Sequence, residues 1–248
     1  MNLKKNATLI AAAAALSLAA GASWAQDGKT GASAVLTSAD GSIAVSEPTF
    51  TPRGAASISC QSFDGIDSWD GLDDADNIII DLDIGAGNAL TGVGWDIGIA
   101  TVGASWLSEA TIQHSDSNGS ADPNAINLNV GVGDDASGDQ DYTSGGAIVD
   151  FTDNGLNDIV AGADGIVRLQ IFESFDDNAD AIDANMRNAA APALCAGLAV
   201  ACTDQAACNG AVTGLPQSQP VPVNNPWALG LLVLVLAGLG FVAVRRFA

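Results

Sequence analysis

The sequence predicts an all-β protein, an antiparallel and jelly-roll-like β-sandwich, flanked by an N-terminal signal helix and a C-terminal transmembrane helix. Apolar residues alternate with polar or small ones in several segments between residues 60 and 175. Asp far outnumbers Glu, and there are 28 Gly; both residue types favour turns over helix interiors. The same region has no strong apolar repeat of 3.6 residues, the pattern of a helix packed on a core.

The strands are predicted from a period of two, which gives a strand one buried face. In residues 93–99, Val93, Trp95, Ile97 and Ile99 alternate with smaller or polar residues. The other predicted strands are residues 78–84, 110–114, 126–132, 147–151 and 167–172. Asp164-Gly165 lies between residues 159–160 and 167–171, which predicts a β-hairpin.

The N-terminus carries the pattern of a secretory signal peptide over residues 1–25. Two lysines precede an apolar run that is too short to span a bilayer comfortably, and small residues end it. Cleavage is expected between Ala25 and Gln26, by signal peptidase after export through the Sec machinery.

The C-terminus is expected to be a membrane span. Residues 227–244 contain no charge, begin at Trp227 and are followed by Arg245 and Arg246. At about 1.5 Å per residue, this stretch nearly matches a hydrocarbon core of about 30 Å. The positive-inside rule keeps the arginines in the cytoplasm and the acidic body outside.

The segment from Val221 onwards resembles the C-terminal sorting tags of Gram-negative bacteria, the PEP-CTERM-like group. The closest variant is IPTL-CTERM: Pro222 and Trp227 stand at its second and seventh positions, and the basic end is kept, but Val-Asn-Asn-Pro replaces the positions between. The resemblance covers residues 221–248. It implies an inner-membrane-anchored precursor that an exosortase, a membrane-embedded transpeptidase, cuts and releases or transfers to the cell surface. A plain single-span anchor is the alternative.

The body also resembles small secreted proteins that carry such tags. The likeness rests on Leu-Thr-Gly-Val-Gly-Trp-Asp-Ile at residues 90–97, on Ser-Trp-Leu-Ser-Glu at 105–109, on Gly-Ala-Asp-Gly-Ile-Val-Arg-Leu at 162–169 and on residues 172–177. It implies a β-sandwich and brings no catalytic residue with it. We expect a partly irregular lead-in over residues 26–59, a sandwich over 60–183 and an Ala/Cys/Pro-rich spacer over 184–220.

Four cysteines in an exported chain predict two disulfides, with three possible connectivities. Three of them, Cys195, Cys202 and Cys208, are close in sequence, and Cys60 is distant. Proximity favours one bridge within the cluster and one from Cys60 to it. A metal site is the alternative, but the spacings lack the Cys-x-x-Cys pairs of zinc knuckles.

Composition excludes several functions. The net charge is −21, with 8 Lys and Arg against 29 Asp and Glu, which argues against nucleic-acid binding. One His, His114, excludes sites with two imidazoles, and we expect it to be a half-exposed strand residue. Glu109 and Glu173 are a formal carboxylate pair for glycoside hydrolysis, but among so many acids such a pair has little weight. We therefore expect no enzyme.

The densest acidic group is the best candidate for structural calcium, because calcium takes carboxylate and carbonyl oxygens from loops. Its members lie within one short stretch: Asp64, Asp67, Asp70, Asp73, Asp74 and Asp76. The group lacks EF-hand spacing, and a solvated acidic surface is the alternative. No other cofactor is expected.

The sequence thus predicts a non-enzymatic protein of the cell surface or the extracellular polysaccharide matrix. The alternative is a module that binds carbohydrate or another ligand, stabilised by calcium. Trp69 and Trp106 are its candidate aromatic platforms. Exposure of either indole favours ligand binding, whereas burial of both favours a structural role.

Overall fold

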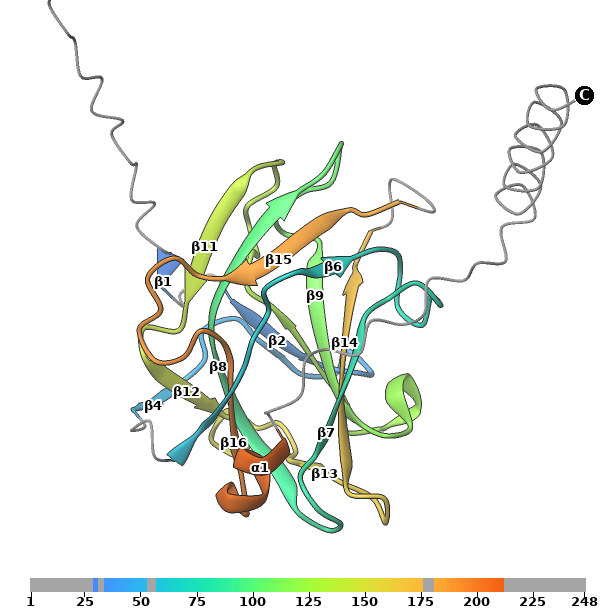
Figure 1. The fold of residues 1–248 in the computed structure, drawn as a ribbon, viewed down its shortest axis with the longest axis vertical. Coiled ribbons are helices and arrows are strands. Elements are labelled where there is room, and N and C mark those ends of the chain that lie inside the picture. The colour runs from blue at the N-terminus through green and yellow to red at the C-terminus, as the bar shows by residue number, and fades with distance from the viewer. Residues whose placement is uncertain (1–28, 31–33, 53–56, 176–180, 212–248) are drawn as a thin grey trace, which may run out of the picture.

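The computed structural model describes residues 29–30, 34–52, 57–175 and 181–211. They form two largely antiparallel β-sheets, whose facing sides share one apolar core. β8 and β14 run along the long axis of the body (Figure 1). The all-β prediction is therefore confirmed, in a sandwich-like arrangement.

Sheet B has six strands in the order β3-β2-β10-β9-β14-β7. Their bounds are β2 Val35–Ser38, β3 Ala44–Val45, β7 Ile79–Asp83, β9 Ala110–Asp116, β10 Ile126–Asn129 and β14 Ile166–Glu173. Every pair in this sheet is antiparallel. In β14, Val167, Leu169 and Ile171 belong to the core, so Arg168 and Gln170 lie on the outer face of the sheet.

Sheet A has ten strands gathered around the long strand β8. Their bounds are β1 Lys29–Thr30, β4 Phe50–Pro52, β5 Ser59–Gln61, β6 Ile66–Ser68, β8 Ala89–Thr101, β11 Asp139–Thr143, β12 Ala147–Asp150, β13 Ile159–Val160, β15 Ala184–Asn188 and β16 Gly197–Cys202. β8 pairs with β11, β12, β13, β15 and β16, and the short β1 pairs with β11 in parallel. Two single-turn 3-10 helices, η2 Gly119–Ala121 and η3 Thr152–Asn154, and the helix α1 Gln205–Ala211 complete the described elements.

The core is built from the predicted alternation. Val93, Trp95, Ile97 and Ile99 of β8 are fully buried in it. Each such side chain contributes about 1.5–3 kcal/mol relative to an exposed one. The small residues between them lie on the opposite face of β8. At Gly98, for example, the guanidinium of Arg187 occupies the space that a Cβ would need.

The sandwich extends beyond the predicted boundary at residue 183. β15 and β16 pair with β8, and α1 follows, so residues 184–211 are part of the body and not an extended spacer. β16 escapes prediction because both its faces are covered. Leu198 and Val200 face the main core, while Ala199 and Ala201 lie in a second apolar cluster, which removes the polar alternation.

Two further expectations differ from the structure. The lead-in contributes β2, which pairs with β10 inside sheet B. The turn at Asp164-Gly165 is present, with Gly165 at φ +77°, but its flanking strands do not form a hairpin. β13 pairs with β8 in sheet A, and β14 pairs with β7 and β9 in sheet B. The turn therefore crosses from one sheet to the other.

Candidate functional site

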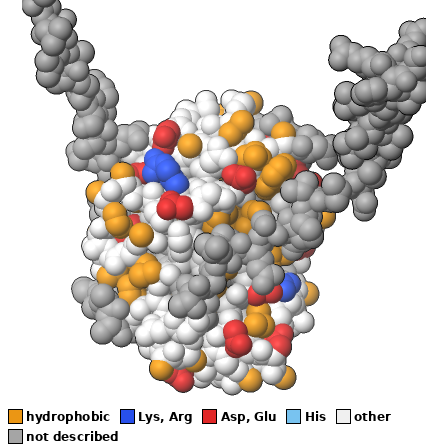
Figure 2. Space-filling model, viewed as in Figure 1, with side chains coloured by type: hydrophobic (Ala, Val, Ile, Leu, Met, Phe, Trp, Pro, Cys, Tyr) orange, Lys and Arg blue, Asp and Glu red, His pale blue; other side chains and the backbone are white. Residues whose placement is uncertain are grey.

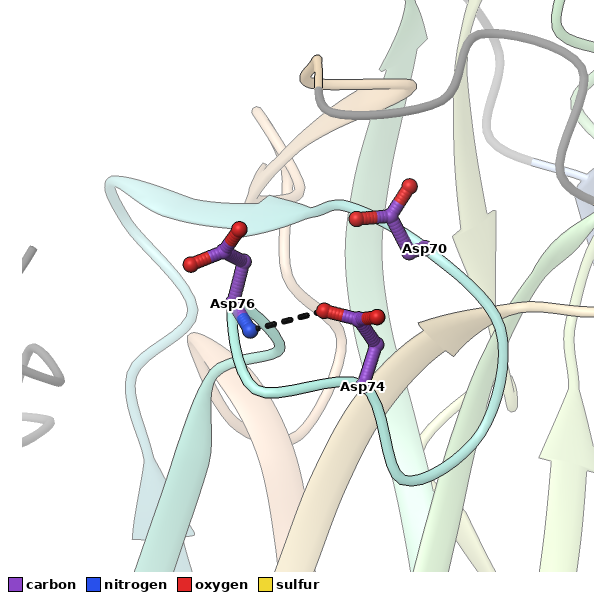
Figure 3. Close-up of side chains that lie close together, drawn as sticks. All are labelled: Asp70, Asp74 and Asp76. Carbon is purple, nitrogen blue, oxygen red and sulfur yellow. Dashed lines mark hydrogen bonds between the residues drawn. The ribbon is translucent and has the colours of Figure 1, made fainter. Parts of the chain in front are cut away.

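The loop between β6 and β7 gathers three of the predicted calcium ligands. Asp70, Asp74 and Asp76 each offer a carboxylate oxygen, and these oxygens all lie within 4.8 Å of one another. Figure 3 shows the three side chains projecting from this one loop, which curves around them. The Asp76 backbone N–H donates to Asp74 Oδ1 at 3.0 Å.

Asn77 braces this loop from inside. It is fully buried, its Nδ2 donates to the Gly71 carbonyl at 2.6 Å, and its Oδ1 accepts from the Asp70 backbone N–H at 3.2 Å. Asn77 was not among the residues predicted from the sequence. The available signal was an Asn directly before an apolar strand, a residue type that bonds neighbouring backbone groups in turns.

The other three predicted ligands do not join this cluster. Asp64 accepts from the Asn188 backbone N–H at 2.9 Å, and Asp67 accepts from Asn185 Nδ2 at 2.7 Å, so both tie β6 and its neighbourhood to β15. Asp73 lies in the loop with a left-handed backbone, φ +69°, and accepts from Ser120 Oγ at 2.6 Å.

The cluster suits a hard divalent cation. Three carboxylates supply up to six oxygens, and calcium takes six to eight oxygen ligands in flexible geometry. Asp70 is 6% exposed, while Asp74 and Asp76 are more accessible, so water has access to complete the coordination. Asp70, Asp74 and Asp76 would hold the ion, whose charge would offset the repulsion between them.

The two candidate platforms differ in exposure. Trp106, in the turn between β8 and β9, is 45% exposed, and its backbone N–H donates to Glu109 Oε2 at 2.7 Å. The neighbouring Ser105 is fully buried and donates to Asp183 Oδ1 at 3.0 Å, which anchors this turn. Trp69 is half-buried, directly before Asp70. Of the two candidate platforms, Trp106 is the more exposed.

His114 is fully buried, which corrects the expectation of a half-exposed residue. It lies on the core side of β9, and its Nδ1 is 3.3 Å from the Ile126 carbonyl oxygen. Burial lowers the pKa of His114 to about 4, so the imidazole is neutral near pH 7. Glu109 and Glu173 are also buried.

All four cysteines are paired in the structure. Cys60 in β5 is joined to Cys195, whose Cα lies 5.6 Å away, and Cys202 at the end of β16 is joined to Cys208 in α1 at 6.1 Å. The buried carboxylate of Asp96 positions Cys195, because its Oδ2 accepts from the backbone N–H groups of Leu194 and Cys195 at 2.9 and 3.1 Å.

The described body is acidic, and its arginines are committed to ion pairs. Arg168 contacts Asp81, and Arg187 contacts Asp139 and Asp141. Figure 2 shows the basic side chains of one face lying beside acidic ones. The charges of both arginines are therefore offset by neighbouring carboxylates.

The terminal predictions fall outside the described residues. They are the cleavage site at Ala25 and Gln26, and the sorting motif with Val221, Pro222, Trp227, Arg245 and Arg246. Within the described part of the chain, no helix is both long and apolar enough to cross a membrane.

Comparisons with known proteins give no match for this chain, whether with protein-family models, with curated proteins or with solved structures.

Proposed function

We propose that this chain is an exported, non-enzymatic protein of the Gram-negative cell surface or extracellular matrix. The observation that carries the proposal is the pairing of all four cysteines, because disulfides persist in oxidising compartments and are rare in the cytosol. The patterns of residues 1–25 and 221–248 support the same conclusion from both ends of the chain.

The proposed route begins with the Sec machinery and signal peptidase. The chain then stays in the inner membrane through residues 227–244 until an exosortase-type transpeptidase processes the tag. Its proposed partner outside is extracellular polysaccharide. We also infer jelly-roll-like connectivity, which is supported by partners distant in sequence, such as β2 with β10 and β5 with β16.

Thiol labelling in cells tests export. The full chain and a variant lacking residues 1–25 are expressed in a Gram-negative host, and free thiols are alkylated before lysis. We expect all four cysteines of the full chain to be protected and those of the truncated chain to react. Equal reactivity in the two proteins would contradict the proposal, and a Cys60→Ser, Cys195→Ser variant calibrates the labelling of one bridge.

The second candidate function is a surface module that binds carbohydrate or another ligand and is stabilised by calcium. The exposed indole of Trp106 favours it, and the Asp70, Asp74 and Asp76 cluster supplies the calcium ligands. In this role the ion fixes the loop between β6 and β7.

Thermal melting tests the calcium component. A ligand that binds only the folded state at 100 times its Kd stabilises it by about 2.7 kcal/mol. We expect millimolar calcium to raise the melting midpoint of the native chain relative to a chelator, and Asp74→Asn to reduce that rise. Asp153→Asn in η3, an exposed acid on another part of the surface, is the matched control. An unchanged midpoint in the native chain removes calcium from the account.

A further inference from the structure

A second feature lies beside the acidic loop, on the outer face of sheet B. It is a cavity of about 290 Å³. Ile79 of β7 and Arg168 and Gln170 of β14 form its sheet side, while Asp73 and Asp74 come from the loop between β6 and β7, and Asn118 from the segment after β9. Only Asp74 is shared with the candidate calcium ligands.

The walls of the cavity are fastened to each other. Ser120 Oγ donates to Asp73 Oδ2 at 2.6 Å, which links η2 to the acidic loop. Asn118 is held in place by Asp116, because its backbone N–H and its Nδ2 both donate to the Asp116 carboxylate at 2.8 Å. The cavity is therefore largely pre-formed, as small-ligand sites usually are.

Gln170, a residue on the sheet side of the cavity, has an amide donor that is unpaired among the described residues. Gln170 is 3% exposed, and its Nε2 has no hydrogen-bond partner among the described residues. Unpaired buried amides are costly. A ligand hydroxyl that reached the Gln170 amide would satisfy Nε2 by accepting a hydrogen bond from it.

The charges around the cavity select against anions. Asp73 and Asp74 bring two carboxylates, and the only cation on the lining, Arg168, already gives Nε and Nη2 to the Asp81 carboxylate at 2.8 and 3.2 Å. Carboxylates accept hydrogen bonds from hydroxyl or ammonium groups, and they repel a uronate or a phosphate.

We propose that this cavity binds one neutral or amino sugar unit of a polysaccharide. A sugar ring carries hydroxyl groups on several sides. These groups would hydrogen-bond with the Gln170 amide, the carboxylates of Asp73 and Asp74, and the side chain of Asn118. The volume of about 290 Å³ lies just below the usual range for ligand sites, about 300–1,000 Å³, and thus suits a single unit. The inference rests on the second candidate function and names its ligand class and site.

Saturation-transfer NMR on the full chain in detergent, with both disulfides intact, tests the proposal. The probes are glucose, galactose, mannose, glucosamine and glucuronate. We expect signals from at least one neutral hexose or from glucosamine, and none from glucuronate. Binding of glucuronate equal to the others, or no signal from any hexose or from glucosamine, overturns the proposal.

Gln170→Met separates binding from folding. It removes the unpaired amide at nearly constant volume, so we expect the free energy of unfolding to stay equal or to rise while sugar affinity falls about tenfold. Asp73→Asn is the second variant, because Asn tolerates the left-handed backbone, and it should lower the affinity similarly. Asp153→Asn is the control with unchanged binding. Retained affinity in both cavity variants refutes the site.

Two variants distinguish a failure of the cavity proposal from a failure of the proposed function. If Trp106→Ala abolishes sugar binding while Gln170→Met does not, the ligand lies at the exposed indole; the module is then retained and the cavity is refuted. The export proposal depends on thiol protection and is unaffected by either result.

Discussion

Acid should destabilise this protein through His114 in particular. The imidazole is fully buried against the Ile126 carbonyl, and burial lowers its pKa from 6.5 to about 4. Its Nε2 has no hydrogen-bond partner among the described residues. Protonation inside the core would place a charge there, so the folded state resists it while the unfolded chain does not.

The direction and magnitude of this pH effect on folding stability follow from proton linkage. Between pH 6.5 and about 4 the unfolded chain binds the proton more readily than the folded chain, so this contribution to stability is lost as pH falls through that window. With the pKa at 6.5 in the unfolded chain and about 4 in the folded chain, the loss of stability reaches about 3 kcal/mol once His114 is protonated in both states. Between pH 7 and pH 4.5 the expected loss is about 2 kcal/mol.

Urea unfolding at pH 7 and pH 4.5, followed through tryptophan fluorescence, measures this loss in the native chain and in His114→Leu. The carboxylates titrate in both proteins, so the difference between their pH responses isolates the imidazole. We expect His114→Leu to be at least as stable at pH 7 and to lose about 2 kcal/mol less on acidification. Thr111→Val on the same strand is the non-titrating control. Identical pH responses of the native chain and His114→Leu would refute the reasoning.

Two further perturbations test the packing of the segment that follows β14. Replacing Cys60 and Cys195 by Ser should destabilise the chain more than replacing Cys202 and Cys208, because the first bridge spans 135 residues and the second spans 6. The chain-entropy model gives a loss of about 5 kcal/mol for the first bridge and about 2 kcal/mol for the second. Calorimetry that shows the reverse order of stability would contradict this. Gly197→Ala should cost more than about 2 kcal/mol, since Gly197 has φ +103° and a Cβ there would clash with the Gln61 carbonyl oxygen. Gly210→Ala in α1, where a Cβ meets nothing within 4 Å, is the control and should be neutral or stabilising, so equal melting points for the two variants would refute the clash.

The strands with one covered face were predictable from the sequence. β14 shows why: Val167, Leu169 and Ile171 face the core, and polar residues stand between them. β16 was not predictable in the same way, because Ala199 and Ala201 are buried in a second cluster and the polar alternation disappears. The Asp164-Gly165 turn was evident, but local turn chemistry does not determine whether the next strand returns to the same sheet.

The sequence predicted that the candidate site would be built from aspartates, but not which of them lie close together. Six acids were candidates, and the structure brings together only Asp70, Asp74 and Asp76, because Asp64 and Asp67 bond to residues near 185–188. The cavity at Gln170 had no sequence signal, since its lining comes from β7, β14 and two loops that only the pairing of sheet B brings together.

The C-terminus of the mature protein provides the most direct test of the central claim, which is export followed by sorting. Mass spectrometry of the protein purified from its native cell reads this end without labels or variants. The account predicts an N-terminus at Gln26 and the absence of residues beyond about position 221. A mature chain that still ends at Ala248 would contradict sorting and leave a plain membrane anchor.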